Sequence, residues 1–414
     1  MSLLIAGMDR IYQHVLEAHL REERQMAFIA GPRQVGKTTL LQSLLNEDDC
    51  LLSWDRPSQR EWILEGSDAL LERIGLFNLR PADTRSPRLA FDEIHKFRHW
   101  KRFLKGLFDA VDGRASILVT GSARLNIYKR GGDSLMGRYF LYRMHPLTLG
   151  ELTGRFDQRE SLILPPVPVD DASFESLMRF GGFPEPFLRA NDRFHRRWSD
   201  LRLEQLFRED LRDLTRVQDI DQVISLSRLL IGQSGQLANF STLAKQISVT
   251  VDTIRRWLDV LESFYFCYRI RPWFKNVSKS LRKQPKIYPF DWSVIPDPGG
   301  RCECFVAGHL LKAVHHWTDC GLGRFTLHFL RDTAQREVDF LIARDGMPWM
   351  LVEVKQSVGK SVSSSLKYFA GLLNAPHVFQ AVLNEDPIEA DCFASSKPSQ
   401  PLQVPLRTLL AQLP

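Results

Sequence analysis

The fold of the N-terminal part is decided by one stretch, Gly31-Pro32-Arg33-Gln34-Val35-Gly36-Lys37-Thr38. It fits the pattern G-x-x-x-x-G-K-[ST], in which backbone N–H groups close around phosphate oxygens at the start of a helix. The apolar run at residues 26–30, MAFIA, predicts a buried strand before the loop, and residues 37–45 predict a helix after it. A strand before and a helix after is the context that this motif requires, so the sequence predicts a nucleotide-binding P-loop.

The residues of this loop have distinct predicted roles. Lys37 is expected to reach the β and γ phosphates, and Thr38 is expected to hold Mg²⁺. ATP with Mg²⁺ is the predicted cofactor pair. The loop residues predicted to bind it are Gly31, Pro32, Arg33, Gln34, Val35, Gly36, Lys37, Thr38 and Thr39.

Two further apolar runs predict strands that end in polar residues. Residues 88–91 lead into Asp92 and Glu93, and residues 116–120 lead into Ser122. Asp92 is expected to bind Mg²⁺, often through water, and Glu93 to act as the general base that polarises the attacking water. Ser122 is a candidate sensor of the γ-phosphate. Strands that alternate with helices favour a parallel α/β sheet for this part.

Arg138 is a candidate cationic group for the γ-phosphate, in its own subunit or in a neighbouring one. A surface ion pair is an equally good interpretation of this arginine.

A helix-turn-helix and a basic stretch follow in the middle of the chain. Residues 241–247 and 251–263 predict two short helices around a tight turn. Residues 269–286, RIRPWFKNVSKSLRKQPK, carry seven basic residues, no acidic one and two aromatic ones, which is typical of the wing of a winged helix. The predicted nucleic-acid contacts are Arg255, Arg256, Arg271, Lys275, Lys279, Arg282 and Lys283. Protein binding by this module is the alternative.

A second candidate active site lies in the C-terminal part, where residues 325–330, 336–343 and 349–355 predict strands. Asp339 lies on one strand, and Glu353 and Lys355 lie two residues apart on the next, so the latter two project from the same face. With Glu303 from the preceding helix, Asp339 and Glu353 are predicted to bind Mg²⁺ or Mn²⁺, and Lys355 to assist phosphodiester hydrolysis. The alternative is an edge strand with a solvated ion pair.

Composition bounds the remaining possibilities. The chain has 414 residues, a formal net charge of +6 and six cysteines. The modest basic excess makes a polyanion a plausible partner. The cysteines are too sparse for a disulfide framework, and those near His309 lack the paired C-x-x-C spacing of zinc sites. No signal peptide or membrane span is recognisable, so the sequence predicts a cytoplasmic protein that does not enter a membrane.

Taken together, these motifs resemble a known family. The segments GPRQVGKTTLL, FDEIHKF, LVTGSARL, GRYFLYRMHPLTLGE, GGFPEP, VDTIRRWLDVLE, FVAGHLL, REVDFLI and LVEVKQS are similar to bacterial and archaeal ATPases of the AAA superfamily that carry a C-terminal domain of unknown function, DUF4143. The resemblance implies that this domain has the restriction-endonuclease-like, PD-(D/E)XK, fold. It implies Asp92 and Glu93 as Walker B acids, and Glu303, Asp339, Glu353 and Lys355 as the nuclease-type constellation.

The sequence therefore predicts a mixed α/β protein with four parts. They are a P-loop AAA-type ATPase core at 1–155, a connector and helical lid at 156–230, a winged helix-turn-helix at 231–292 and a restriction-endonuclease-like domain at 293–414. The expected function is ATP-driven remodelling or metal-dependent cleavage of DNA, duplex or branched, by a homo-oligomer that forms a hexameric or other ring. One alternative is a nucleotide-dependent signalling switch whose C-terminal domain binds DNA or protein without cutting. Another is an accessory protein that docks on a partner.

Overall fold

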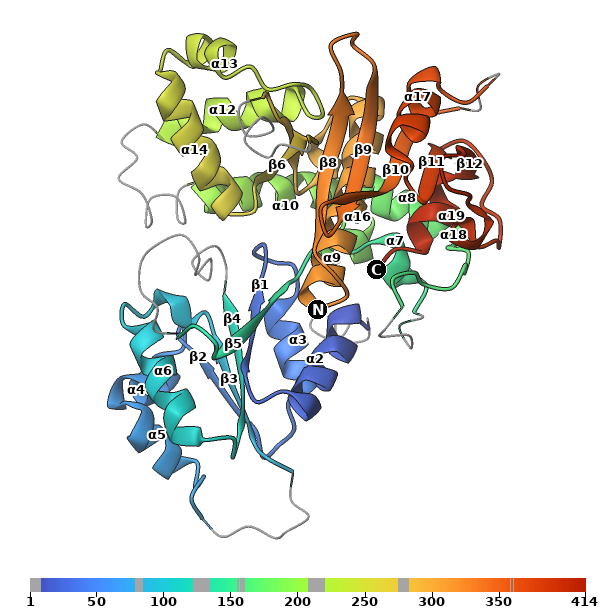
Figure 1. Cartoon of the computed structure of the whole chain (residues 1–414). Helices are drawn as coiled ribbons and strands as arrows, with labels where there is room; N and C mark the ends of the chain where they lie inside the picture. The colour runs from blue at the N-terminus through green and yellow to red at the C-terminus, as the bar shows by residue number, and fades with distance from the viewer. Residues whose placement is uncertain are drawn as a thin grey trace. The chain divides into compact units, whose positions relative to one another are not determined.

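The short apolar runs of the N-terminal part become strands of one parallel sheet (Figure 1). The order across the sheet is β2-β3-β4-β1-β5, and every neighbouring pair is parallel. Because parallel strands end at the same edge, the loops after β1, β3 and β4 meet there. The strands are β1 (Met26–Ala30), β2 (Cys50–Ser53), β3 (Arg88–Asp92), β4 (Ser116–Gly121) and β5 (Tyr139–Arg143).

The computed structural model describes residues 9–78, 85–121, 135–154, 156, 161–207, 220–274, 283–357, 359 and 361–414. The chain divides into two compact units, Met1–His145 and Pro146–Pro414. The boundaries predicted at residues 155, 230 and 292 do not coincide with this division.

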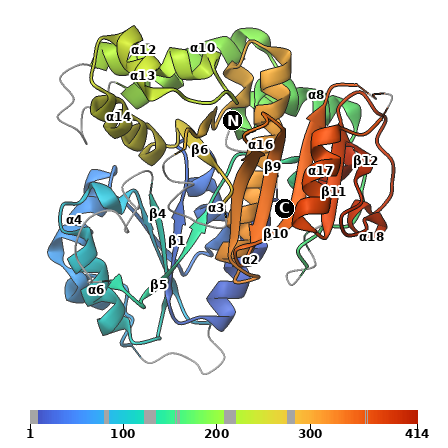
Figure 2. The same ribbon diagram turned by 45° about the horizontal axis from the view of Figure 1, so that its top comes forward.

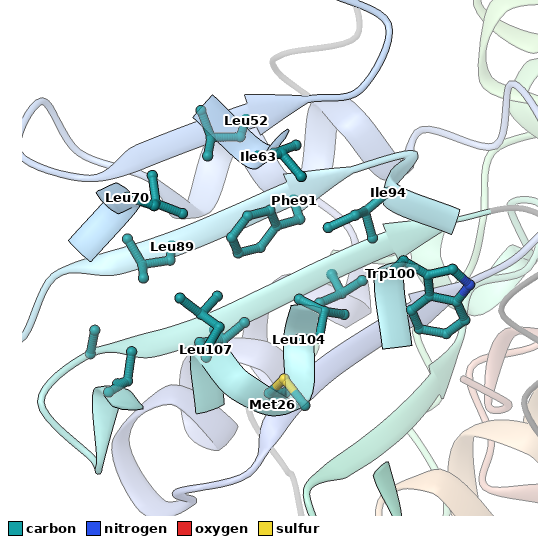
Figure 3. Packing of buried hydrophobic residues seen from close by; sticks show 14 of the residues in the cluster. Met26, Leu52, Ile63, Leu70, Leu89, Phe91, Ile94, Trp100, Leu104 and Leu107 are labelled. Atoms are coloured by element: carbon teal, nitrogen blue, oxygen red, sulfur yellow. The ribbon is translucent and has the colours of Figure 1, made fainter. Parts of the chain in front are cut away.

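Helices cover both faces of the first sheet. Figure 3 shows Met26 and Phe91 of the strands packed with Leu104 and Leu107 of α6, and burial of such side chains is the main stabilising term of the unit. The second face is covered by α2 and α3, which contact β1 and β4. The helices of this unit are α2 (Ile11–Glu22), α3 (Lys37–Leu44), α4 (Pro57–Glu65), α5 (Ser67–Arg73), η1 (Ile94–Lys96) and α6 (Trp100–Val111).

The second unit begins with helices. Ser248 adopts the left-handed conformation between α13 and α14, which gives the tight turn predicted between them. These helices are α7 (Leu149–Leu152), α8 (Asp171–Phe180), α9 (Pro184–Arg189), α10 (Asp192–Gln205), α12 (Ile220–Gly232), α13 (Phe240–Ile247) and α14 (Val251–Ser263).

A seven-stranded mixed sheet follows, in the order β12-β11-β10-β9-β8-β6-β7. Figure 2 shows α16 and α17 beside this sheet; α16 contacts β8 and β9, and α17 contacts β9, β10 and β11. Its elements are β6 (Cys267–Pro272), β7 (Lys286–Pro289), η6 (Trp292–Val294), α16 (Pro298–Asp319), β8 (Phe325–Arg331), β9 (Glu337–Arg344), β10 (Met347–Lys355), α17 (Ser364–Leu373), β11 (His377–Val382), α18 (Cys392–Ser395), β12 (Leu402–Pro405) and α19 (Leu406–Ala411).

The predicted wing takes a different place from the one expected. β6 and β7 form an antiparallel pair after α14, as a wing does, but β6 also pairs in parallel with β8 through Arg271 and Pro272. This pairing makes the two strands part of the seven-stranded sheet, because β8 offers a free edge for β6. In the described residues, the predicted wing strands β6 and β7 thus belong to the seven-stranded sheet and not to a separate sheet of their own.

Within the described part of the chain, no helix combines the length and the apolar character needed to cross a membrane.

Candidate functional site

The loop after β1 has the backbone geometry of a phosphate cradle. A Cβ atom at Gly31 would lie 2.3 Å from the carbonyl oxygen of Met144, so only glycine fits there. Gln34 and Gly36 have positive φ angles of 63° and 102°. These angles turn the loop back on itself immediately before α3 begins at Lys37, and such turned loops direct backbone N–H groups inward.

Lys37 and Thr38 lie at the start of α3. The Lys37 side chain is buried, and its Nζ donates hydrogen bonds to the carbonyl oxygens of Gly31 at 2.9 Å and Pro32 at 2.6 Å. The ammonium group is thus folded against the loop that it would serve. A short rotation of a flexible lysine side chain would bring it from these carbonyls to a bound phosphate.

Asp92, at the end of β3, is held by two threonine hydroxyl groups. Thr120 Oγ1 donates to Asp92 Oδ1 at 2.5 Å, and Thr38 Oγ1 lies 3.1 and 3.2 Å from the two carboxylate oxygens. Burial raises the pKa of Asp92, and the negative charge of Glu93 raises it further, whereas the hydrogen bonds from Thr120 and Thr38 and the charge of Lys37 lower it. Oxygen ligands from a P-loop threonine and a strand-end aspartate are the donor set that holds Mg²⁺ in P-loop proteins.

Glu93 follows in a strained backbone conformation. Its φ angle is 56°, in the left-handed region that residues other than glycine rarely adopt. The carboxylate lies 3.6 Å from Lys96 Nζ and 3.7 Å from His95 Nε2, and Lys96 also pairs with Asp55 at 2.7 Å. Strain of this kind is typical of functional positions, where the surrounding structure fixes a side chain in a required place.

The residues at the end of β1 and β3 fit the predicted ligand, ATP with Mg²⁺. The turned loop, the glycine that a Cβ atom would obstruct and the converging oxygens of Thr38 and Asp92 are all suited to a magnesium nucleotide. Ser122, the predicted sensor, lies outside the described residues. Thr120, two residues earlier, is fully buried and makes the contact with Asp92.

Arg138 lies at the opposite end of the strands from the P-loop, where β1 begins. Its backbone oxygen accepts a hydrogen bond from Met26 N, at the start of β1, whereas the P-loop follows the end of β1. β1 has five residues, so these two ends are separated by about 16 Å at 3.3 Å per residue. The guanidinium group pairs with Asp109 at 2.9 Å. A role for Arg138 at the nucleotide of its own subunit is therefore corrected to a surface ion pair.

The predicted C-terminal carboxylates lie on β9 and β10. Val354 N donates to Asp339 Oδ2 at 2.8 Å, and the β9–β10 register, carried one residue beyond Phe340 and Val352, sets Asp339 opposite Glu353. Burial raises the pKa of Asp339 to about 7, and the negative charges of Glu303 and Glu353 contribute to that rise. Asp339 and Glu353 are therefore neighbours, as the sequence predicts.

Each of the other carboxylates already has a cation as partner. Lys355 Nζ donates to Glu353 Oε1 at 2.7 Å. Lys286 Nζ, a buried ammonium group on β7, lies 3.0 Å from Glu303 Oε1 and 2.8 Å from Glu337 Oε1.

Two additional hydrogen-bond partners are found on Glu303 and Glu337. Tyr288 donates its hydroxyl hydrogen to Glu303 Oε1 at 2.6 Å, and Arg331 pairs with Glu337 at 2.5 Å. These bonds occupy Glu303 Oε1 and Glu337 Oε2, whereas Glu353 Oε2 is buried and has no hydrogen-bond partner among the described residues.

The predicted Mg²⁺ or Mn²⁺ site at Glu303, Asp339 and Glu353 is not formed in this arrangement. Across the residues that the structure describes, no group of three or more His, Cys, Asp or Glu side chains is placed to hold a metal ion. The physical reason is that Lys286 and Tyr288 draw the Glu303 carboxylate into their own hydrogen bonds. As arranged, Asp339 and Glu353 are neighbours, but Glu303 does not complete a three-carboxylate metal site with them.

The predicted nucleic-acid contacts are distributed unevenly. Arg255 pairs with Asp252 at 2.9 Å within α14, and Arg256 is exposed on the same helix. Arg271 is half-buried on β6, and Lys283 is exposed before β7. Lys275, Lys279 and Arg282 lie outside the described residues.

Two residues of these sites were not predicted. Thr120 belongs to the apolar strand predicted at residues 116–120. Its place at the end of that strand is the feature of the sequence that could have indicated a role at the site. Lys286 was read as one of several wing cations, and its place at the start of a short apolar strand, KIYP, could have indicated burial.

Comparison with protein-family models assigns three parts of the chain. Residues 23–153 match an AAA domain, residues 171–296 match a domain of unknown function, DUF8612, and residues 298–391 match a domain of unknown function, DUF4143. The uncharacterized protein Rv2008c of Mycobacterium tuberculosis is 24% identical over 358 residues, which are 83% of this chain and 73% of that protein. The uncharacterized protein MJ1637 of Methanocaldococcus jannaschii is 22% identical over 296 residues, which are 64% of this chain and 60% of that protein.

Solved structures are also similar at low identity. The Aeropyrum pernix ORC1 protein, solved in complex with DNA, is 14% identical to this chain with a TM-score of 0.30. The match covers 72% of this chain and 90% of the ORC1 chain. AMPPCP-bound DnaA from Aquifex aeolicus is 12% identical with a TM-score of 0.31. The match covers 62% of this chain and 88% of the DnaA chain. These TM-scores are too low to carry a functional comparison. The family models establish that the chain combines an AAA domain at residues 23–153 with a DUF4143 domain at residues 298–391.

Proposed function

We propose that this protein binds ATP with Mg²⁺ at the P-loop and hydrolyses it. The observation that carries this proposal is the convergence of Thr38 Oγ1 and the Asp92 carboxylate, 3.1 Å apart, beside a turned glycine loop. Thr38 and Asp92 would hold Mg²⁺, and the ion would supply positive charge that neutralises the charge developing during phosphoryl transfer.

The side chains around this point have separate tasks. Lys37 releases its two loop carbonyls and binds phosphate oxygens instead. Thr120 keeps the Asp92 carboxylate oriented through its hydrogen bond. Glu93 accepts the proton of the attacking water, and its half-buried carboxylate lies beside the ammonium group of Lys96 and the imidazole of His95.

ATP turnover by three proteins tests this proposal. The wild type should release phosphate from ATP only when Mg²⁺ is present. Glu93→Gln should bind ATP but lose activity by about 10²-fold or more, because a general base contributes about 10²- to 10⁴-fold. Lys37→Ala should lose binding as well. Wild-type rates in Glu93→Gln would refute the assignment of the base.

DNA is the proposed partner of the ATPase. The support is the basic excess of the chain and two exposed cations, Arg256 on α14 and Lys283 before β7. The activity that we propose is ATP-driven remodelling of duplex or branched DNA by a homo-oligomer of this chain. Phosphate release measured with single-stranded, duplex, forked and four-way-junction DNA tests it: stimulation by one of these supports remodelling.

Cleavage by the DUF4143 domain stays a prediction from the sequence. Among the described residues, no three of the carboxylates around Lys286 are placed together to hold a metal ion, so the geometry adds no support for phosphodiester hydrolysis. The same DNA panel with Mg²⁺ or Mn²⁺ decides the matter. Products that appear with the wild type and vanish with Asp339→Asn would establish a nuclease.

The second candidate function is a nucleotide switch whose C-terminal domain binds without cutting. The observation that favours it is the set of internal cation partners of Glu303, Glu337 and Glu353. Slow ATP turnover that no DNA changes, together with no cleavage, would select this function over DNA remodelling.

A further inference from the structure

The segment that follows Glu93 carries a second cluster of cations. Residues 96–105 read KFRHWKRFLK and contain five lysines and arginines and no acid. Arg98, Arg102 and Lys105 are exposed, and Lys101 is half-buried. We call these four residues the α6 basic surface. None of them belongs to the nucleic-acid contacts predicted from the sequence.

The fold of α6 sets this surface outward. Trp100, Leu104, Leu107 and Val111 are the buried residues of the helix and pack in the core of the first unit. Their helical spacing leaves the face with Lys101, Arg102 and Lys105 toward solvent. The cations therefore gather on one side of a rigid helix, which the core holds in place.

The first turn of α6 departs from the usual charge pattern of helices. Cations near a helix N-terminus are unfavourable, because the helix dipole is positive there. α6 has Lys101 and Arg102 in its first turn and no acid, whereas α8, α10, α12 and α14 all have an aspartate in theirs. This arrangement works against the stability of the helix and concentrates positive potential at its start.

The α6 basic surface has little compensation by acids, apart from the electrostatic interaction of Lys105 with Asp109. Among the residues that the structure describes, no ion pair involves its four cations, although α6 itself contains Asp109, which pairs with Arg138. On α14, by contrast, Arg255 is paired with Asp252.

We propose that the α6 basic surface binds the phosphate backbone of DNA. A protein partner would need apolar contact area, and the apolar side chains of this helix are buried in the core instead. A polyphosphate needs only exposed cations at fixed positions, and it releases counterions when they bind. This inference rests on DNA as the proposed partner and places its contact in the AAA domain.

The surface is connected to the catalytic edge of the sheet. Lys96, at its N-terminal side, lies 3.6 Å from the Glu93 carboxylate and 2.7 Å from Asp55. DNA bound on the α6 basic surface would change the electrostatic potential at Lys96, and through this contact the environment of the Glu93 carboxylate. Duplex DNA should therefore change the rate of ATP hydrolysis through this contact.

The test compares two triple variants that remove the same charge. One is Arg98→Gln, Arg102→Gln and Lys105→Gln on the α6 basic surface. The matched control removes three other exposed arginines, on α10 of the second unit: Arg193→Gln, Arg196→Gln and Arg197→Gln. Binding of a fluorescein-labelled duplex is followed by anisotropy between about 50 and 200 mM salt. The thermal unfolding midpoint of each protein checks that it is folded.

The α6 variant should lower the slope of log affinity against log salt by about 2.7, since each lost phosphate contact removes about 0.9. It should also lose the effect of DNA on ATP hydrolysis, while the α10 variant keeps both. Equal losses in the two variants, or an unchanged α6 variant when the wild type binds DNA, would overturn this inference and leave DNA as the partner. Displacement of the duplex by polyglutamate at equal charge would indicate an acidic protein instead. A wild type that binds no DNA would overturn the DNA partner and this surface together, with ATP hydrolysis unaffected.

Discussion

Replacing Asp339 with asparagine is expected to stabilise the protein at neutral and alkaline pH. Burial, together with the charges of Glu303 and Glu353, raises the pKa of Asp339 from 3.8 to about 7. This rise corresponds to at most about 4 kcal/mol, at about 1.4 kcal/mol per pKa unit. The side chain is half-buried, and solvent screening reduces the expected gain to about 2 kcal/mol. Asparagine keeps the amide oxygen that accepts the hydrogen bond from Val354 N.

The sign follows from proton binding. Between pH 4 and 7 the folded protein holds a proton on Asp339 that the unfolded chain releases, so the wild type loses stability as the pH rises through this window. The asparagine side chain does not titrate, and the variant should therefore exceed the wild type at pH 8 and approach it at pH 4. Each kcal/mol should raise Tm by about 2–4 °C for a unit of this size.

Thermal unfolding at several pH values, with intrinsic fluorescence, measures the effect. The matched control is Asp386→Asn, which changes an exposed aspartate of the same domain and should move the free energy of unfolding by less than about 0.5 kcal/mol. A variant no more stable than the wild type at pH 8, or a difference that does not shrink on acidification, would show that Asp339 is not held in an unfavourable charged state. Added Mg²⁺ or Mn²⁺ that stabilises the wild type but not the variant would point to a metal at this position.

Three other substitutions test separate parts of the structure. Gly31→Ala should cost about 1–3 kcal/mol of stability in thermal unfolding and weaken ATP binding, because its Cβ atom would meet the Met144 carbonyl at 2.3 Å; wild-type stability would disprove the close approach. Lys286→Met should cost about 1–3 kcal/mol in urea unfolding, because it removes the buried cation from two partly buried carboxylates, and a neutral result would mean that water or other cations replace it. Arg138→Ala removes only the pair with Asp109 and should leave ATP turnover in dilute solution within about twofold, far from the 10³-fold loss that an arginine finger costs; a loss that appears only in concentrated protein would indicate a role in a neighbouring subunit.

The sequence predicted strands best where burial on both faces leaves a continuous apolar run, and helices best where apolar residues recur at helical spacing. Residues 26–30 form β1 with the predicted bounds, and residues 251–263 form α14 with the predicted bounds. Edge strands were missed, because one side of an edge strand contacts solvent and its sequence is mixed. β5 reads YFLYR and is mostly half-buried, and β2 has four residues.

The candidate sites were predictable in part for a related reason. A motif fixes residues that are close along the chain, so the Gly31–Thr38 loop and the acids Asp92 and Glu93 could be read from the sequence. The partner of a buried charge comes from anywhere in the fold. Lys286 lies 17 residues before Glu303 and on a different element, and no local pattern connects them.

The partners of the two acidic centres differ in a way that bears on which one takes a metal. In the first unit, the Asp92 carboxylate receives hydrogen bonds from the hydroxyl groups of Thr38 and Thr120, which orient the carboxylate without neutralising it. A divalent cation there gains an anionic ligand and a hydroxyl ligand that are already in position. In the second unit, ammonium groups hold the carboxylates of Glu303 and Glu353, and a metal ion at Glu303 Oε1 would first have to displace Lys286. That exchange breaks buried ion pairs whose loss is costly unless new charge replaces them. Neutral hydroxyl partners therefore favour metal binding at the end of β3. Cationic partners oppose it between β7, β9 and α16, although the sequence carries acidic residues typical of a metal site in both units.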